Sequence, residues 1–421
     1  MTNLNKLLSP ALIGFVGLYA FGTGKALAES DIEDLIKNGS LFGQLRYRYE
    51  HVEQDNFPLE NANASTIRAN IGFKTGEFKG FQALAEGQFI THIGNDTFND
   101  TVNGRTTYPV VVDPDGAEFN QFWLSWNGIP KSKLTVGRQK IDLDNQRFIG
   151  SVDWRQNDQT LDAVQFKNNS LKNVEWLYLY SYNVNRIQGN KHPLGDLDAN
   201  IHVFNAAYSL GKKLKLVGYG YWIEFKQLAS QSSKTFGLRA TGTLPVNADW
   251  NFSYEAEIAT QSENANNPLS FSETYYHISP SVSGYGFTLN AGYEVLGSDG
   301  AAAFQTPLAT LHKFNGWADT FLATPISGLR DLYLSAAYKI SGVNNLIDGL
   351  VITTVYHKFD DDQSLSGDFG NELDLSVGKT FTNLNLGPIK SLNVLLKYAD
   401  YNGTANIPGR KKLWVQLGAG F

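Results

Sequence analysis

Strict alternation between apolar and polar residues is the feature that most constrains this chain, and its C-terminal segment shows it clearly. Counting back from Phe421, every second residue is apolar: Ala419, Leu417, Val415 and Leu413. Side chains two positions apart lie on the same face of a β-strand, so this segment presents one apolar face. An apolar face and a terminal aromatic residue are typical of the closing strand of an outer-membrane β-barrel. The alternation therefore predicts a strand that faces lipid.

The same period of two recurs along the chain and predicts an all-β fold, a transmembrane antiparallel barrel of eighteen strands. Short connections alternate with long ones, as expected for short periplasmic turns and long extracellular loops. A soluble β-sandwich also alternates, but here Tyr and Phe gather at the strand ends, as in the aromatic girdle of a membrane barrel. The expected strands are 41–52, 65–77, 80–93, 118–128, 132–143, 160–168, 174–186, 201–210, 213–225, 234–244, 249–261, 271–282, 286–297, 329–340, 349–359, 369–381, 391–401 and 411–421.

Residues 1–28 are expected to be a signal peptide. Lys6 precedes an apolar stretch over residues 7–21, and the small residues around position 28 fit a cleavage site. A transmembrane anchor is the alternative, but that stretch is shorter than the roughly 20 apolar residues that a spanning helix needs. Residues 29–421 then form a single barrel domain, and its expected location is the cell outer membrane.

Composition excludes several other classes of protein. The chain has no Cys, so it has neither a lipidated cysteine anchor nor a disulfide framework. Its net charge of −6 argues against a nucleic-acid partner, because nucleic-acid-binding proteins usually present a basic face. The expected partners are outer-membrane lipid, lipopolysaccharide, and the barrel-assembly machinery, which would recognise the strand that ends at Phe421.

Two sets of residues carry a resemblance to a known family. The first comprises residues 135–140 (TVGRQK), 145–150 (NQRFIG), 153–156 (DWRQ) and 160–163 (TLDA). The second, which is the more specific, comprises residues 304–319 (FQTPLATLHKFNGWAD), 324–325 (TP) and 328–333 (GLRDLY). Both resemble the alginate-export family of outer-membrane β-barrels. The resemblance implies a monomeric barrel of eighteen strands whose loops fold inward and gate the pore.

The long connection over residues 298–328 is too apolar to lie freely in water. It combines turn-forming Gly and Pro with large apolar residues, which are Phe304, Leu308, Leu311, Phe314, Trp317 and Phe321. We expect it to pack into the mouth of the barrel as a gate or constriction, because long packed loops are often functional. A loop that packs on its neighbours without gating is the alternative. The candidate gate residues are His312, Lys313, Trp317 and Asp319.

If the apolar residues face lipid, their neighbours face the lumen. Basic residues gather on the first strands and acidic ones on the eleventh to sixteenth, and rings of either sign select ions of the opposite charge. Alternatively, these charges pair with one another and keep the wall rigid. The mixed lumen fits a polar or anionic organic solute and equally an uncharged one. The candidate pore-lining residues are Arg46, Arg48, Arg68, Arg138, Arg239, Glu255 and Glu257.

No constellation typical of an enzyme or a metalloprotein is visible. The seven His residues are dispersed without metal-ligand spacing, and no Gly-x-Ser-x-Gly nucleophile motif is present. Asp360, Asp361 and Asp362, with Asp368 nearby, could supply oxygen ligands to Ca²⁺, but their spacing matches no defined calcium loop and favours a solvated loop. We therefore expect no catalytic residues, no metal and no cofactor.

The hypothesis from the sequence is a passive outer-membrane channel for a polar or anionic organic solute or an exopolysaccharide. A general or specific uptake porin unrelated to alginate is the first alternative. A lipid-modifying enzyme embedded in the barrel is the second, and a structural or adhesive barrel with a blocked lumen is the third.

Overall fold

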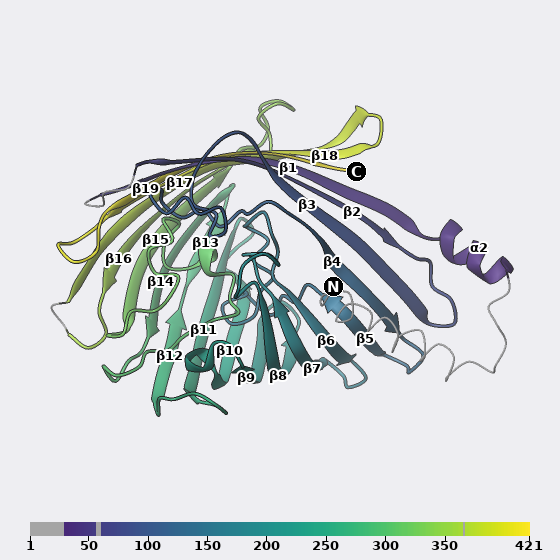
Figure 1. The fold of residues 1–421 in the computed structure, drawn as a ribbon, viewed down its shortest axis with the longest axis horizontal. Coiled ribbons are helices and arrows are strands. Elements are labelled where there is room, and N and C mark those ends of the chain that lie inside the picture. Colours follow the sequence, from purple (N-terminus) through teal and green to yellow (C-terminus); the bar gives the residue numbers. More distant parts are fainter. Residues whose placement is uncertain (1–28, 56–59, 365–366) are drawn as a thin grey trace.

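The computed structural model describes residues 29–55, 60–364 and 367–421, so the expected signal peptide lies outside the described residues. These residues form one antiparallel sheet that closes on itself, because the first strand pairs with the last. The result is a barrel whose strands tilt around a common axis (Figure 1). None of the helices described is long and apolar enough to cross a membrane.

The barrel is built from short helical pieces and long strands. The helical elements are α2 (Glu29–Lys37), η1 (Ala229–Gln231) and η2 (Leu311–Lys313). The strands of the first half are β1 (Ser40–Gln54), β2 (Ala62–Lys74), β3 (Phe81–Thr97), β4 (Gly116–Trp126), β5 (Ser132–Gln139), β6 (Thr160–Asn168), β7 (Val174–Asn185), β8 (Asp196–Leu210) and β9 (Leu214–Phe225). Those of the second half are β10 (Ser233–Pro245), β11 (Trp250–Glu263), β12 (Ser272–Ile278), β13 (Ser281–Gly284), β14 (Phe287–Leu296), β15 (Leu329–Lys339), β16 (Val351–Asp360), β17 (Asp368–Leu386), β18 (Ile389–Asn402) and β19 (Arg410–Gly420).

The eighteen expected strands are confirmed, although one of them is interrupted. β12 and β13 both pair with β11 on one side and β14 on the other, so they occupy a single position in the barrel. The break falls at Ser279 and Pro280, and proline has no N–H to donate to the sheet. Each predicted strand overlaps a strand of the structure, and the differences lie at strand ends.

Alternation places apolar side chains on the outside of the barrel and polar ones on the inside. On β15, Leu332 and Leu334 are exposed on the outer surface, whereas Asp331, the residue before Leu332, is buried on the lumen side. Leu334 lies beside Ala291 of β14 and Tyr356 of β16, so the apolar surface continues across strands. This band is the surface that lipid hydrocarbon covers.

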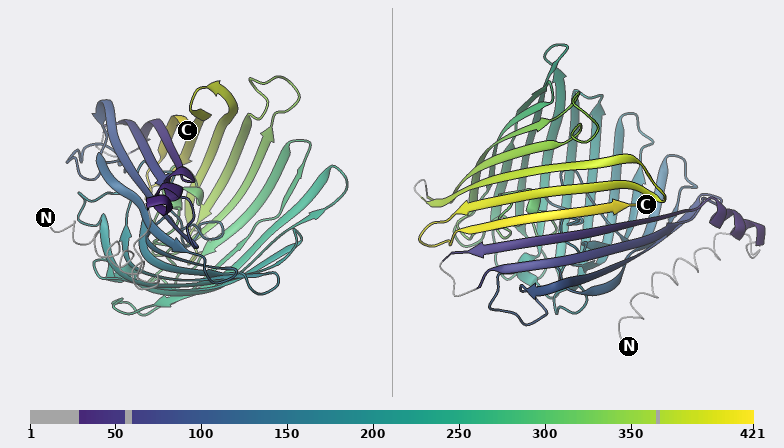
Figure 2. Two further views of the ribbon diagram at one scale, coloured as in Figure 1. Left: turned by 90° about the vertical axis from the view of Figure 1, so that its right-hand side faces the viewer. Right: turned by 90° about the horizontal axis from the view of Figure 1, so that it is seen from above.

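Aromatic pairs mark the end of the barrel where the connections are short. Phe287 and Tyr338 lie next to the β13–β14 turn with ring centroids 4.4 Å apart, and Trp250 contacts Tyr285 at 5.8 Å. Helix α2 and the C-terminal end of β19 lie at this same end (Figure 2). The pairs form the periplasmic girdle that the sequence predicts.

The main hydrophobic core of this barrel lies in its lumen. Phe148 and Phe304, which come from two different long loops, pack on each other at 5.9 Å. Phe148 also packs edge-on against Tyr275 of the wall at 5.4 Å. The lumen is therefore partly filled by loops that carry their own apolar contacts to the wall.

The two faces of β15 give a direct test of this arrangement. Leu334→Lys places a charge in the lipid-facing band and should lower the free energy of unfolding by about 2–4 kcal/mol. Ser335→Lys, one residue along and facing the lumen, should change it by less than about 1 kcal/mol. Denaturant titration in lipid vesicles, read from the heat-modifiable mobility of the barrel, measures both. Equal effects from the two lysines would contradict the assignment of faces.

Candidate functional site: two loops that meet in the lumen

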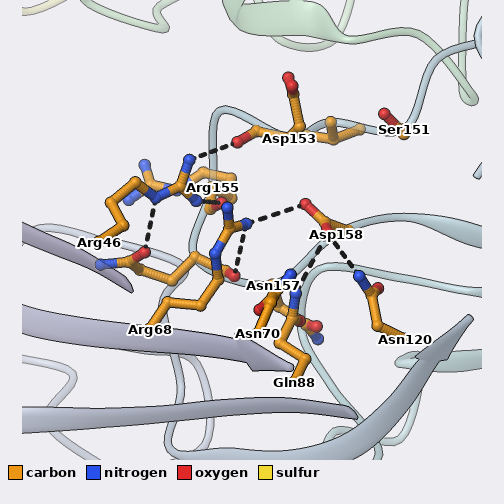
Figure 3. A network of polar contacts seen from close by, with 12 residues as sticks. Arg46, Arg68, Asn70, Gln88, Asn120, Ser151, Asp153, Arg155, Asn157 and Asp158 are labelled. Atoms are coloured by element: carbon orange, nitrogen blue, oxygen red, sulfur yellow. Dashed lines mark hydrogen bonds and ion pairs between the residues drawn. The ribbon is translucent and has the colours of Figure 1, made fainter. Parts of the chain in front are cut away.

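The β5–β6 loop (residues 140–159) turns into the barrel and lies against the inner faces of β1 and β2. Arg46 of β1 donates from Nη1 to the carbonyl oxygen of Asp153 at 2.7 Å, and its Nε donates to Oε1 of Gln156 at 3.0 Å. Arg68 of β2 forms an ion pair with Asp158 at 3.1 Å. Figure 3 shows both arginines reaching from the wall to this loop. The basic residues of the first strands therefore hold a loop in place.

Asp158 is the polar centre of this attachment. Besides Arg68, its carboxylate accepts hydrogen bonds from Gln88 of β3 at 3.1 Å and Asn120 of β4 at 2.9 Å, and it pairs with Lys140 (Figure 3). Burial alone would raise the pKa of Asp158, but Lys140 and Arg68 outweigh burial and hold the pKa below its usual value. The carboxylate is therefore charged, and both of its oxygens have polar partners.

A second charged contact fixes the same loop to the connection between β3 and β4. Arg155 donates to Asp113 at 2.7 Å and to Glu50 of β1 at 2.8 Å. Glu50 also lies 3.6 Å from Lys412 of β19. These buried charges are all paired, as groups removed from water must be.

The β14–β15 loop (residues 297–328) enters the lumen from the opposite wall. The backbone N–H groups of Trp317 and Ala318 donate to Asp374 at 3.2 Å and to Glu372 at 2.6 Å, both on β17. Lys412 of β19 forms a 2.6 Å ion pair with Asp319 in the loop. Acidic residues of the late strands therefore accept hydrogen bonds from backbone amides of this loop.

His312 connects this loop to three neighbours at once. Its Nδ1 lies 2.7 Å from Asp319, and its Nε2 lies 2.7 Å from Nζ of Lys397 on β18. Its ring stacks on Trp154 of the β5–β6 loop at 4.1 Å with an interplanar angle of 6°. The ammonium of Lys397 also lies 3.7 Å from the ring centre of Trp317, a cation–π distance. Both inward loops thus converge on Lys397.

The two loops also bond directly to each other and form a septum across the lumen. Ile149 and Leu308 pair as a parallel β-bridge, and the N–H of Gly150 donates to the carbonyl of Leu308 at 2.8 Å. Thr310 N–H donates to the carbonyl of Gln146 at 3.1 Å. The pairing explains why an apolar loop of this length is ordered inside a barrel, since its backbone groups are satisfied by the other loop.

The structure separates the predicted pore-lining residues into three groups. Arg46, Arg48 and Arg68 are 7%, 0% and 2% exposed, because the β5–β6 loop covers them. Arg48 lies over the Trp154 ring at 4.1 Å. They contact the loop and do not face open solvent in the lumen.

The expectation that Arg138 faces the lumen is wrong. It lies on the same face of β5 as Val136 and pairs at 2.7 Å with Asp162, which shares its face with the outward-exposed Val164 of β6. Arg138 is therefore on the outer face near the end of β5, in a local ion pair.

Arg239, Glu255 and Glu257 remain on the lumen side of β10 and β11. Arg239 pairs with Glu255 at 2.7 Å and lies 3.5 Å from Glu257, which also accepts a 2.7 Å hydrogen bond from the hydroxyl of Tyr219. His277 of β12 lies 3.4 Å from Glu255. These charges therefore pair with one another along the wall, which is the alternative to ion-selective rings that the sequence analysis gave.

The predicted gate residues share one loop but not one environment. His312, Trp317 and Asp319 make the contacts described above, whereas Lys313 is exposed. Sequence reasoning missed Asp158 as a central residue and Lys397 as the point where the loops converge. In the described part of the chain no group of three His, Asp or Glu residues is arranged to hold a metal ion.

The open space in the lumen lies beside the septum. A cavity of about 700 Å³ runs along the inner wall from β9 to β14. Its lining includes Thr241, Thr243, Asn251, Ser253, Ser279, Ser281, Ser283 and Asn290. These uncharged hydroxyl and amide side chains make up most of the polar lining, and Lys212, Lys215 and Glu255 are its charged members.

The sequence profile described as alginate export matches residues 39–267, which is more than half of the chain. The chain belongs to the alginate export family. Membership confirms the resemblance carried by residues 135–163, whereas the motif at residues 304–333 lies beyond the matched segment. It also places the barrel in the bacterial outer membrane.

Solved structures resemble the barrel over nearly its whole length. OpdK from Pseudomonas aeruginosa, crystallised with vanillate, has a TM-score of 0.71 at 13% identity, covering 92% of this chain and 99% of its own. OpdO from Pseudomonas aeruginosa has a TM-score of 0.71 at 13% identity, covering 93% and 99%. OccAB2 from Acinetobacter baumannii has a TM-score of 0.71 at 16% identity, covering 92% and 99%. At these identities the likeness shows the fold. No curated protein matches the sequence significantly.

Neutralising Asp158 tests whether this residue holds the β5–β6 loop in place. Asp158→Asn leaves Arg68 buried without its ionic partner, which should destabilise the docked β5–β6 loop by about 3–5 kcal/mol. Trypsin cleavage after Arg147 or Arg155 in intact proteoliposomes should become markedly faster. Asp360→Asn removes a partner of the exposed Lys358 and serves as control, because exposed pairs contribute about 0–1 kcal/mol. Equal cleavage rates in the two variants would contradict the role of Asp158.

The docking of the β14–β15 loop should depend on pH through His312. Burial lowers the pKa of His312 to about 3, although Asp319 acts to raise it. Because an undocked histidine titrates near 6.5, the stability gained from the neutral ring is present above about pH 6.5 and is lost as the pH falls toward 3.

Hydrogen–deuterium exchange of residues 304–319, corrected for intrinsic rates, measures this dependence. Protection should fall by up to about tenfold per pH unit between pH 6 and 4, the limit for one proton. His312→Gln should remove most of that slope. Asp319, whose pKa is held well below its usual range chiefly by His312 and Lys412 against burial, should act only at lower pH. An unchanged slope in the variant would show that another group controls docking.

Proposed function

We propose that this protein is a passive outer-membrane channel for small polar organic solutes. The observation that carries the proposal is the septum with an open cavity beside it. The loops close one side of the lumen through Ile149 and Leu308, and the space of about 700 Å³ along β9–β14 remains. A passage of this kind suits molecules of limited size.

The β14–β15 loop is the proposed gate, with His312, Trp317 and Asp319 as the groups that hold it closed. These residues reach three strands of the wall and the other loop, so the loop has a defined docked position. Lys313 is exposed beside them and is free to meet solute.

The family description raises a second function, the export of an alginate-like polysaccharide. An extended chain would need the septum to swing aside, because the two inward loops are bonded to each other by backbone groups. The structure of OpdK with vanillate supports the smaller solute, since that barrel of similar fold holds a small organic molecule. The lipid-modifying enzyme gains no support from the family match. Lipopolysaccharide and the barrel-assembly machinery stay predicted partners.

Shortening the proposed gate tests this function. Replacing residues 303–325 with two glycines should increase single-channel conductance in a planar bilayer severalfold, because the septum loses half of its material. Shortening the exposed periplasmic connection at residues 341–348 is the control and should leave conductance within about twofold. A wild-type barrel and a shortened barrel that both fail to conduct would rule out the channel.

A further inference from the structure

The open cavity beside the septum has a chemical character of its own. Its neutral side chains carry both donors and acceptors: Thr243 and Ser253 are 2.9 Å apart, and Asn290 donates to Ser279 at 2.7 Å. The hydroxyl of Tyr333 also donates to Ser279 at 3.2 Å. Hydroxyl groups can reverse their role by rotation, so this wall can exchange hydrogen bonds with a partner of the same kind.

Two of the three charged groups that line the cavity, Lys215 and Glu255, have a partner of opposite charge. Lys215 lies 3.9 Å from Asp144, and Arg239 is shared between Glu255 and Glu257. Lys212, in the turn that follows β8, is the third charged residue of the lining. At Lys215 and Glu255 the partner offsets the charge, so these groups attract a passing ion less than unpaired groups would.

The arginines that would attract an anion are covered elsewhere. Arg46 and Arg68 are occupied by the β5–β6 loop, on the wall formed by β1 and β2. The open cavity lies along β9–β14 instead. A carboxylate in the cavity would lose part of its hydration without gaining one of these charged partners.

Resting on the channel function proposed above, we infer that the preferred solute is uncharged and rich in hydroxyl groups, a sugar or polyol of one or two rings. Such a molecule matches the wall in hydrogen-bonding type, because each of its hydroxyls both donates and accepts. The cavity volume of about 700 Å³ lies within the range of roughly 300–1,000 Å³ typical of small-molecule pockets.

Efflux from preloaded proteoliposomes tests the inference with three solutes of the same ring size. Glucose, glucuronate and glucosamine differ in charge, and their release is measured with the membrane potential clamped at zero. Glucose should leave at least about threefold faster than either charged sugar. Release of glucuronate as fast as glucose, or faster, would overturn the inference in favour of an anion channel.

A pair of variants connects the rate to the cavity. The double variant Thr243→Val, Ser253→Ala removes the two hydroxyls and should slow glucose release about threefold, with potassium chloride conductance within twofold of wild type. Thr354→Val, on a residue that shares the outer face with Leu289 and Ala336, is the matched control and should change neither rate. Unchanged glucose release in the double variant, with folding verified by heat-modifiable mobility, would overturn the inference.

The outcome also separates this inference from the channel proposal. Conductance without faster glucose release refutes the sugar preference and leaves the channel in place. Absence of both conductance and release refutes the channel and the preference together.

Discussion

The pairing of buried charge in the lumen is the interaction on which the rest of this structure depends. A loop that lies across arginines removes them from water, and an unpaired buried charge costs several kcal/mol. Arg68 is therefore matched by Asp158, and Arg155 by Asp113 and Glu50. These partners come from β1, β2 and two loops, so the septum is attached to the wall through charges that lie far apart in the sequence. Loss of one partner would leave the other charge buried and unpaired, so wall and septum depend on each other.

Apolar packing then gives the septum its order. Phe148 and Phe304 from the two loops meet Tyr275 of the wall, and this cluster continues toward Tyr219 and Tyr221. A barrel whose outer face is covered by lipid gains little from burying that face against protein. Its interior is where water can be displaced, and the aromatic cluster lies there. Charge pairing fixes where each loop lies, and aromatic packing makes that position stable.

The sequence predicted the strands well because their signal is local, whereas the site depends on distant pairs. Period-two alternation placed all eighteen strand positions and put Arg46, Arg48 and Arg68 on the inner face. It could not reveal that Arg68 meets a residue 90 positions away, because the inward path of a loop leaves no periodic pattern. For Arg138 the sequence reasoning assigned the wrong face of the strand. Strand β5 ends at Gln139, and near a strand end a charged residue can face outward toward the polar interface. Its own neighbour Val136 carried the signal for that face.

The lumen consequently has two chemically different regions. Beneath the loops, the side of β1–β4 and β16–β19 is densely charged, buried and internally neutralised, as the contacts of Asp158 and Asp319 show. Near the short turns of β9–β14 the wall is open and lined mainly by hydroxyl and amide side chains. A single set of side chains cannot both anchor a loop tightly and exchange partners quickly with a passing solute, since the first needs strong charged pairs and the second needs weak neutral ones. Separating the two tasks onto different parts of the lumen lets the barrel hold a fixed constriction while keeping a path on which each contact is easily broken.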